Sequence, residues 1–277
     1  MSKHHFVPQL ILKRFRSESG ELFYFNLDQP EKPIISRNPG SIFYSRNLNT
    51  LADRSQTREQ QFAEKLDTPF DALLNRVEVV KDRASTVSFT QGERALAACF
   101  LYYQWSRRPT IVEDVLSNGN IEVLDDVERE AIRVLNESIS SGNPELAEFL
   151  HNVRAMSLVH MNPDVVKEIQ NRGLCIVRNE TGQPFIIGSK PISRYIGLLH
   201  SLTGEAKYEV DQMCFAVSSD LMLMIGPVDL DGRILKIVSA AAVRAYNKGV
   251  ALQSRMIAGP DRNDIIALSK MMLANED

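Results

Sequence analysis

Apolar residues in the middle of the chain recur at the spacing of amphipathic helices. Between residues 56 and 81 they fall at positions 62, 66, 70, 73, 74 and 77, which line one face of a helix. Thr90 and Glu93 form a capping box ahead of the run ALAACFLYYQWS, so a second helix is predicted to run toward Arg107 and to end before Pro109. Three more helices are predicted at 121–139, 144–156 and 162–170.

Short runs rich in β-branched and aromatic residues occupy both ends of the chain. Residues 21–27 and 32–36 flank the turn DQPE and predict a hairpin. Near the C-terminus two more hairpins are predicted from the pairs 174–179 with 184–189, across the turn ETGQ, and 213–218 with 221–226. The closing elements are predicted as a helix around 236–252, a strand at 255–258 and a helix from Asp261.

The segment 37–55 carries many Asn, Ser and Arg residues around the apolar trio Ile42, Phe43 and Tyr44. This composition predicts an irregular loop that its aromatic side chains pin to the body. Function could sit in this loop, and Arg37 and Arg46 either bind a ligand or are solvated; we favour the interpretation that they are solvated.

These elements together predict an α+β fold in one domain over residues 1–277. Residues 56–170 form a helical body, and the N-terminal strand and hairpin join the C-terminal hairpins in an antiparallel sheet against it. The change of pattern near residue 172 divides the domain into subdomains 1–171, mainly helical with the N-terminal hairpin, and 172–277, hairpins with closing helices.

Composition narrows the class of protein. The chain has 277 residues, 44% of them hydrophobic, and a net charge of −3, so any polyanion must be bound by a local cluster of arginines. The three cysteines, Cys99, Cys175 and Cys214, each lie in an apolar run and are interpreted as buried thiols. No signal peptide and no membrane-spanning run is recognised, so a cytoplasmic location without a membrane partner is expected.

The most unusual stretch is the N-terminal HHFVP, followed by the apolar helical run QLILKRF. His4 and His5 point to opposite sides of a short strand, and Pro8 is predicted at the first position of the helix. A histidine here suits general acid/base chemistry, while the alternative is a structural, hydrogen-bonded histidine. Since His5 is nearer the helix N-terminus, it is predicted as the site residue and His4 as its supporting neighbour.

A second polar feature ends the long mid-chain helix. Gln104 lies one turn before Arg107 and Arg108, so an amide and a guanidinium share a helix face that suits a phosphate or carboxylate. The alternative is that these arginines cap the helix and balance its dipole. His151, His160 and His200 belong to no cluster and are not expected to be catalytic.

Several classes of site lack support in the sequence. It contains no HExxH or CxxC motif, so no metal site is predicted, and it contains no Walker loop, GxGxxG or GxSxG motif. The residues identify no cofactor.

The order of HHFVPQ, SIFYSRNLN, FLYYQWSRRP, PFIIGSKPI, MCFAVSSDLMLMIGP and AYN resembles the bacterial domain-of-unknown-function family 4238 over nearly the whole chain. The family has no agreed activity, but the resemblance implies which positions recur in it. These are His4, His5, Pro8, Gln104, Arg107, Arg108, Pro109, Ser189, Pro191 and Asn247. Where the family usually has an aspartate after the serine, this chain has Lys190, which argues against a metal-dependent mechanism that would use that aspartate.

The function expected from these features is cleavage of a phosphodiester by an RNA-directed nuclease of a bacterial defence or toxin kind. His5, His4 and Arg107 are the expected catalytic residues, with histidine moving the proton and the guanidinium stabilising charge on phosphorus. The expected substrate-binding residues are Gln104, Arg108, Ser189 and Asn247. The alternative is a non-catalytic module that binds an anionic ligand, a nucleotide or a protein partner. RNA is the favoured partner, and a protein partner or a second copy of the chain is also considered.

Overall fold

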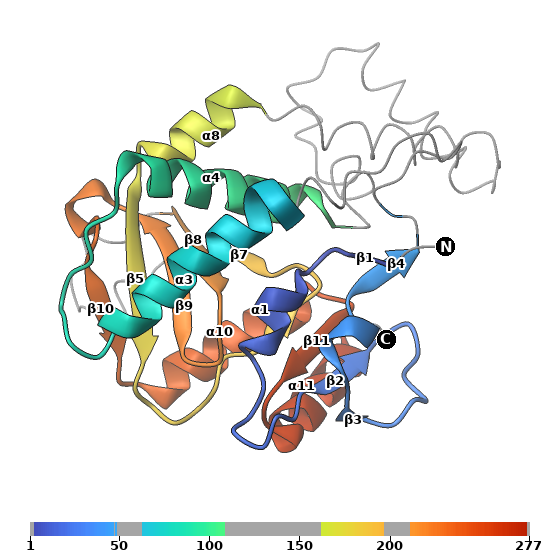
Figure 1. Cartoon of the computed structure of the whole chain (residues 1–277). Helices are drawn as coiled ribbons and strands as arrows, with labels where there is room; N and C mark the ends of the chain where they lie inside the picture. The colour runs from blue at the N-terminus through green and yellow to red at the C-terminus, as the bar shows by residue number, and fades with distance from the viewer. Residues whose placement is uncertain (1–2, 47, 49–62, 109–161, 197–210, 276–277) are drawn as a thin grey trace, which may run out of the picture.

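The computed structural model describes residues 3–46, 48, 63–108, 162–196 and 211–275, and it combines helices with three β-sheets (Figure 1). The helices are α1 (Gln9–Lys13), α3 (Thr68–Val80), α4 (Gln91–Ser106), α8 (Pro163–Gln170), α10 (Ala240–Leu252) and α11 (Arg262–Ala274), with short helical turns η1 (Pro39–Ser41), η2 (Ala63–Asp67, π-helical) and η5 (Val228–Leu230). The strands are β1 (Lys3–His5), β2 (Phe23–Asn26), β3 (Ile35–Ser36), β4 (Tyr44–Arg46), β5 (Gly173–Asn179), β6 (Ile187–Gly188), β7 (Ile192–Ile196), β8 (Asp211–Ala216), β9 (Leu221–Gly226), β10 (Ile234–Ile237) and β11 (Met256–Gly259).

The largest sheet has five strands in the order β10-β5-β9-β8-β7, antiparallel except for the parallel pair β10 and β5. Every residue of β9 is buried, because helices cover the sheet, and α3 and α4 run across its front in Figure 1. At this contact the ring of Phe100 from α4 stacks on Phe70 from α3, with 3.6 Å between the ring centroids, and also meets Phe215 of β8. Helix and sheet therefore share one aromatic core.

A second sheet has four strands in the order β3-β2-β11-β6 and is antiparallel throughout. It draws two strands from the N-terminal part of the chain and two from the C-terminal part, and α11 packs against β2 and β11 (Figure 1). The smallest sheet pairs β1 with β4. Mixed α and β structure is confirmed, but the single predicted sheet is wrong in detail, because the terminal segments are distributed over separate sheets and HHFV pairs with β4.

Two of the three predicted hairpins are confirmed, namely β2 with β3 and β8 with β9. The predicted hairpin of 174–179 with 184–189 is wrong. β5 pairs with β9 and β10, whereas β6 pairs with β11 in the other sheet. The turn between them does form, with Gly182 at φ 73°, but Phe185 then donates its amide to Ser219 and leads the chain away.

Helix boundaries follow their predicted caps closely. Thr90 and Glu93 form the capping box of α4, and Asn162 and Asp261 accept backbone amides at the starts of α8 and α11. Pro8 precedes α1 as its N-cap residue instead of occupying the first helical position. Other differences are that α10 begins only after Ser239, because β10 takes 234–237, and that β4 lies within the predicted loop. The helices predicted at 121–139 and 144–156 lie outside the described residues.

Candidate functional site

The histidine pair lies in β1, opposite β4. His4 is paired with Ser45 and His5 with Tyr44, and the two histidine residues are only 1% and 8% exposed. Phe6 continues the pairing by donating its amide to the carbonyl of Phe43 at 3.0 Å. Phe6 is buried as predicted, and because side chains alternate along a strand the two imidazoles leave β1 on opposite faces.

The imidazole of His5 lies close to two other side chains, those of Gln9 and Tyr44. The amide Nε2 of Gln9, in the first turn of α1, lies 3.5 Å from each ring nitrogen of His5. On the other side the ring of Tyr44 lies with its centroid 5.9 Å from that of the imidazole. The short link through Pro8 brings the side-chain amide of Gln9 close to the ring of His5. The residues of HHFVPQ therefore contact one another as a compact local unit.

Gln104 connects α4 to this unit. Its Nε2 donates to the carbonyl of Phe6 at 2.6 Å, and the residue is 1% exposed. Its Oε1 is buried and has no hydrogen-bond partner among the residues that the structure describes. Gln104 therefore lies beside β1, which we call the histidine strand, and its side-chain amide nitrogen is hydrogen-bonded to the backbone at the end of that strand.

Arg107 and Arg108 both make contacts within the protein. The guanidinium of Arg107, whose side chain is 2% exposed, donates to both carboxylate oxygens of Asp67 at 2.8 and 3.3 Å. Arg108 donates through Nε to the carbonyl of Trp105, and its guanidinium lies 5.0 Å from the centre of the indole ring. Arg108 thus donates to a carbonyl at the end of α4, as the alternative interpretation expects, whereas Arg107 forms an ion pair that was not predicted.

Ser189 and Asn247 hold the backbone of the C-terminal half. The Ser189 hydroxyl accepts the amides of Arg255 and Met256, which fixes the end of β6 against β11. Asn247, buried on α10, accepts the amide of Ile186 at 3.1 Å and donates to the carbonyl of Pro184 at 2.8 Å. These two predicted site residues therefore brace one strand segment.

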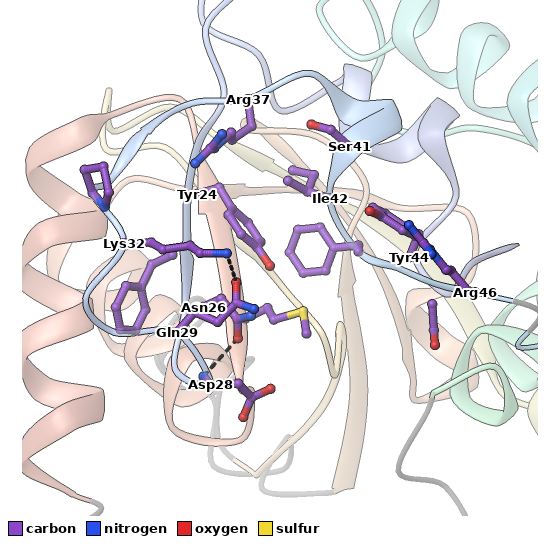
Figure 2. Close-up of a pocket in the computed structure, with 15 residues that line it drawn as sticks. Tyr24, Asn26, Asp28, Gln29, Lys32, Arg37, Ser41, Ile42, Tyr44 and Arg46 are labelled. Carbon is purple, nitrogen blue, oxygen red and sulfur yellow. Dashed lines mark hydrogen bonds between the residues drawn. The ribbon is translucent and has the colours of Figure 1, made fainter. Parts of the chain in front are cut away.

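A pocket of about 710 Å³ lies beside β4, and most of the residues that line it are polar (Figure 2). It is formed by β2, the turn after it, the loop that leads into β4, and Met256 of β11. Its polar lining residues, by type, are the tyrosines Tyr24 and Tyr44, the cations Lys32, Arg37 and Arg46, the acid Asp28, and the neutral hydrogen-bonding residues Asn26, Gln29, Ser41 and Ser45. We refer to it below as the tyrosine–arginine pocket.

Arg37 is the residue that distinguishes this pocket. Its side chain is half-buried, and among the residues that the structure describes its guanidinium has no hydrogen bond or ion pair. Figure 2 shows it on the same side of the pocket as Lys32 and Tyr24, with Tyr44 and Arg46 across from them. Arg37 is therefore only partly exposed, and the fold places it in a pocket wall. Arg46 is exposed, as expected.

The other charged groups of the pocket have partners. Lys32 donates one hydrogen bond to the side chain of Gln29 at 2.7 Å, which leaves two of its three ammonium protons for other acceptors. Asp28, the one carboxylate among the lining residues, is ion-paired with Arg255. Burial, with a smaller contribution from Asp28, raises the pKa of Tyr24 to about 12, so its hydroxyl stays protonated at neutral pH and can act as a donor.

A strained residue links the pocket to the histidine strand. Phe43 has φ 51°, in the left-handed region that non-glycine residues rarely adopt, and such a conformation costs on the order of 1–2 kcal/mol. Its buried ring packs edge-on against Phe6 on one side and Tyr24 on the other. The aromatic packing stabilises this backbone and joins a wall of the pocket to β1.

Little in the sequence indicates this pocket. Its lysine, arginine and amide residues lie in a turn and a loop, where polar residues are ordinarily solvated. The usable signal was the run SIFYSR, in which an isoleucine and two aromatics stand together between polar residues, although no strand was predicted there.

Two other features bear on function. A mainly apolar groove lies between α4 and α8, lined by Leu101, Trp105, Val165 and Met213 among others. Within the described ranges, no three His, Cys, Asp or Glu side chains come together as a metal site. The helices of those ranges also do not combine the length and the apolar composition needed to cross a membrane.

Comparison with known proteins identifies a family but no activity. The model of the family described as "Protein of unknown function (DUF4238)" matches residues 3–263. No curated protein and no solved structure matches the chain. The family match includes the histidine strand, the tyrosine–arginine pocket, the end of α4 and the braced segment around Asn247. Since it covers nearly the whole sequence, the chain belongs to this DUF4238 family.

Proposed function

We propose that the protein binds an anionic, phosphate-bearing small molecule in the tyrosine–arginine pocket. The observation that carries this proposal is Arg37, a half-buried guanidinium in a pocket wall without a partner in the described residues. A guanidinium removed from bulk water favours an anion, and its planar donor fork matches phosphate and carboxylate oxygens. The pocket volume also lies within the roughly 300–1,000 Å³ typical of small-molecule sites.

The surroundings of Arg37 support binding of an anion. Three cationic side chains line the pocket against one carboxylate, and that carboxylate already pairs with Arg255. Tyr24 and the remaining ammonium protons of Lys32 add hydrogen-bond donors. Electrostatics and hydrogen bonding therefore favour the same class of ligand.

Isothermal titration with adenosine 5′-monophosphate, at low ionic strength, tests this proposal. We expect wild type to bind and Arg37→Ala to bind at least about tenfold more weakly, because hydrogen bonds to charged groups contribute roughly 1.5–3 kcal/mol. Arg83→Ala is the matched control, since Arg83 is exposed in the turn after α3 and does not line the pocket. Equal affinities for wild type and Arg37→Ala, or no binding by folded wild type, would contradict the proposal.

A second candidate is cleavage of an RNA phosphodiester, and one contact favours keeping it. Tyr44 lines the pocket on one side and packs against the imidazole of His5 on the other, so a group that shuttles protons lies directly behind the pocket wall. In this proposal a bound phosphate would sit at the pocket, and His5 would act on it after a movement of Tyr44.

The cleavage proposal predicts a difference between the two histidines. Incubation of the protein with labelled RNA and DNA, with and without EDTA, should give RNA cleavage that His5→Gln abolishes and His4→Gln retains in part. Circular dichroism of both variants shows whether each is folded. Absence of cleavage by wild type over a range of divalent ions removes this candidate, and loss in folded His4→Gln alone reverses the assignment.

A further inference from the structure

The charge and the donors of the tyrosine–arginine pocket distinguish between two kinds of phosphate. A phosphate monoester at the end of a molecule carries about −1.5 to −2 charges at pH 7 and three unesterified oxygens. A phosphodiester inside a nucleic acid strand carries one charge and two such oxygens. The pocket has an excess of cations over carboxylates and donors from several elements, which suits the more highly charged group.

The arrangement of the donors supports the same choice. Arg37, Lys32 and Tyr24 come from different parts of the β2–β3 hairpin and its flank, and Figure 2 shows them gathered on one side of the hollow. A guanidinium fork, an ammonium and a phenol can each approach a different oxygen of a single phosphate. A terminal phosphate offers a separate free oxygen to each of the three donors, whereas a diester has only two free oxygens to share among them.

We infer that the ligand of this pocket is a phosphate monoester of mononucleotide or sugar-phosphate size, and that an internal phosphodiester is not its ligand. The inference rests on the proposed function and narrows it from anions in general to one chemical class. The pocket recognises the ligand by its terminal phosphate, which Arg37 and Lys32 bind. The neutral residues Asn26, Gln29 and Ser41 are available to hydrogen-bond hydroxyl groups of the ligand.

A dependence on pH follows from the chemistry of the ligand. The second ionisation of a phosphate monoester lies near pH 6, so below that pH it loses its second charge while a diester keeps its single one. Several protein groups face the same region, namely the pocket's Asp28, Lys32, Arg37 and Arg46, and His5 with Lys3 against the Tyr44 ring. These groups act on both probes, so the ratio of monoester to diester affinity is the quantity that reports the second ionisation of the ligand.

The test is titration calorimetry of the full chain with two matched probes, adenosine 5′-monophosphate and its methyl diester. At pH 7.5 the monoester should bind at least about tenfold more tightly, and at pH 5.5 this ratio should fall several-fold. Ribose 5-phosphate, which keeps the monoester and lacks the base, should bind within about tenfold of the nucleotide. Arg37→Lys, which keeps the charge without the fork, should lose part of the preference, whereas Arg83→Ala should keep all of it.

The possible results separate this inference from the proposed function. Equal affinity for monoester and diester at pH 7.5, with both reduced by Arg37→Ala, overturns the inference and leaves anion binding in place. Failure of ribose 5-phosphate to bind while the nucleotide binds also overturns it, because recognition would then lie in the base. If neither phosphate binds to folded wild type, the proposed function itself fails.

Discussion

Replacing Gly173 by alanine should destabilise the protein by about 3 kcal/mol or more, at the upper end of what overpacking normally costs. Gly173 is the first residue of β5, and a Cβ atom there would lie 2.1 Å from the carbonyl oxygen of Pro227 and 3.2 Å from the amide nitrogen of Asp231. Both neighbours are backbone atoms, so relief requires a shift of the chain after β9. Urea unfolding followed by circular dichroism measures the loss.

Gly249 provides a matched control for this change. It lies exposed within α10, and no heavy atom outside its own helix would come within 4 Å of an added Cβ. Gly249→Ala should therefore be neutral or stabilising by up to about 1 kcal/mol, because alanine favours the helix. If Gly173→Ala unfolds at the same urea concentration as wild type, the packing assigned to the start of β5 is incorrect.

The second large effect is expected at Arg107. Removing one partner of a buried ion pair typically costs about 3–5 kcal/mol, and Arg107→Ala removes a bidentate contact that fixes η2 to the end of α4. The melting temperature should drop accordingly, whatever the effect on any activity. Thermal unfolding by calorimetry gives this quantity directly.

A comparison with Arg76 shows whether burial is the cause. Arg76 pairs with Glu93 at 2.7 Å, but its side chain is 40% exposed, and exposed pairs usually contribute below about 1 kcal/mol. Arg76→Ala should consequently cost much less than Arg107→Ala. Equal small effects in the two variants would show that the Asp67 contact does little for stability and would return attention to a catalytic role for Arg107.

Elements with strong local signals could be predicted from the sequence. The capping box of Thr90 and Glu93 and the apolar pattern behind it are sufficient to define the start of α4. The β8–β9 hairpin follows in the same way from two apolar runs joined by a tight connection. In both cases the interactions that decide the structure lie within a few residues.

Pairing between distant segments could not be predicted in this way. β5 has a turn and a second apolar run after it, yet it pairs with β9 and β10, because a strand covered on both faces carries no alternation that would specify its neighbours. The division of terminal strands between separate sheets has the same origin. The pairing of these strands depends on tertiary packing, which a local sequence pattern cannot predict.

The candidate site shows the same limit. His4, His5 and Gln104 are assigned to one site from the sequence, and the structure shows that all three are buried and that the Gln104 amide reaches the backbone of Phe6. The partner of Arg107 is Asp67, 40 residues upstream, so the ion pair was not visible in the helix sequence. The place of Arg37 in a pocket wall could not be predicted either, because a loop arginine becomes a pocket residue only once β2, β4 and the turn between β2 and β3 are assembled.

The most direct measurement of the central claim is a crystal structure of the protein soaked with adenosine 5′-monophosphate. The account predicts density for the phosphate in the tyrosine–arginine pocket, with its oxygens at hydrogen-bonding distance, about 2.7–3.2 Å, from the guanidinium of Arg37. Phosphate density bound instead beside His5, Gln104 and Arg107, with the pocket empty, would contradict it.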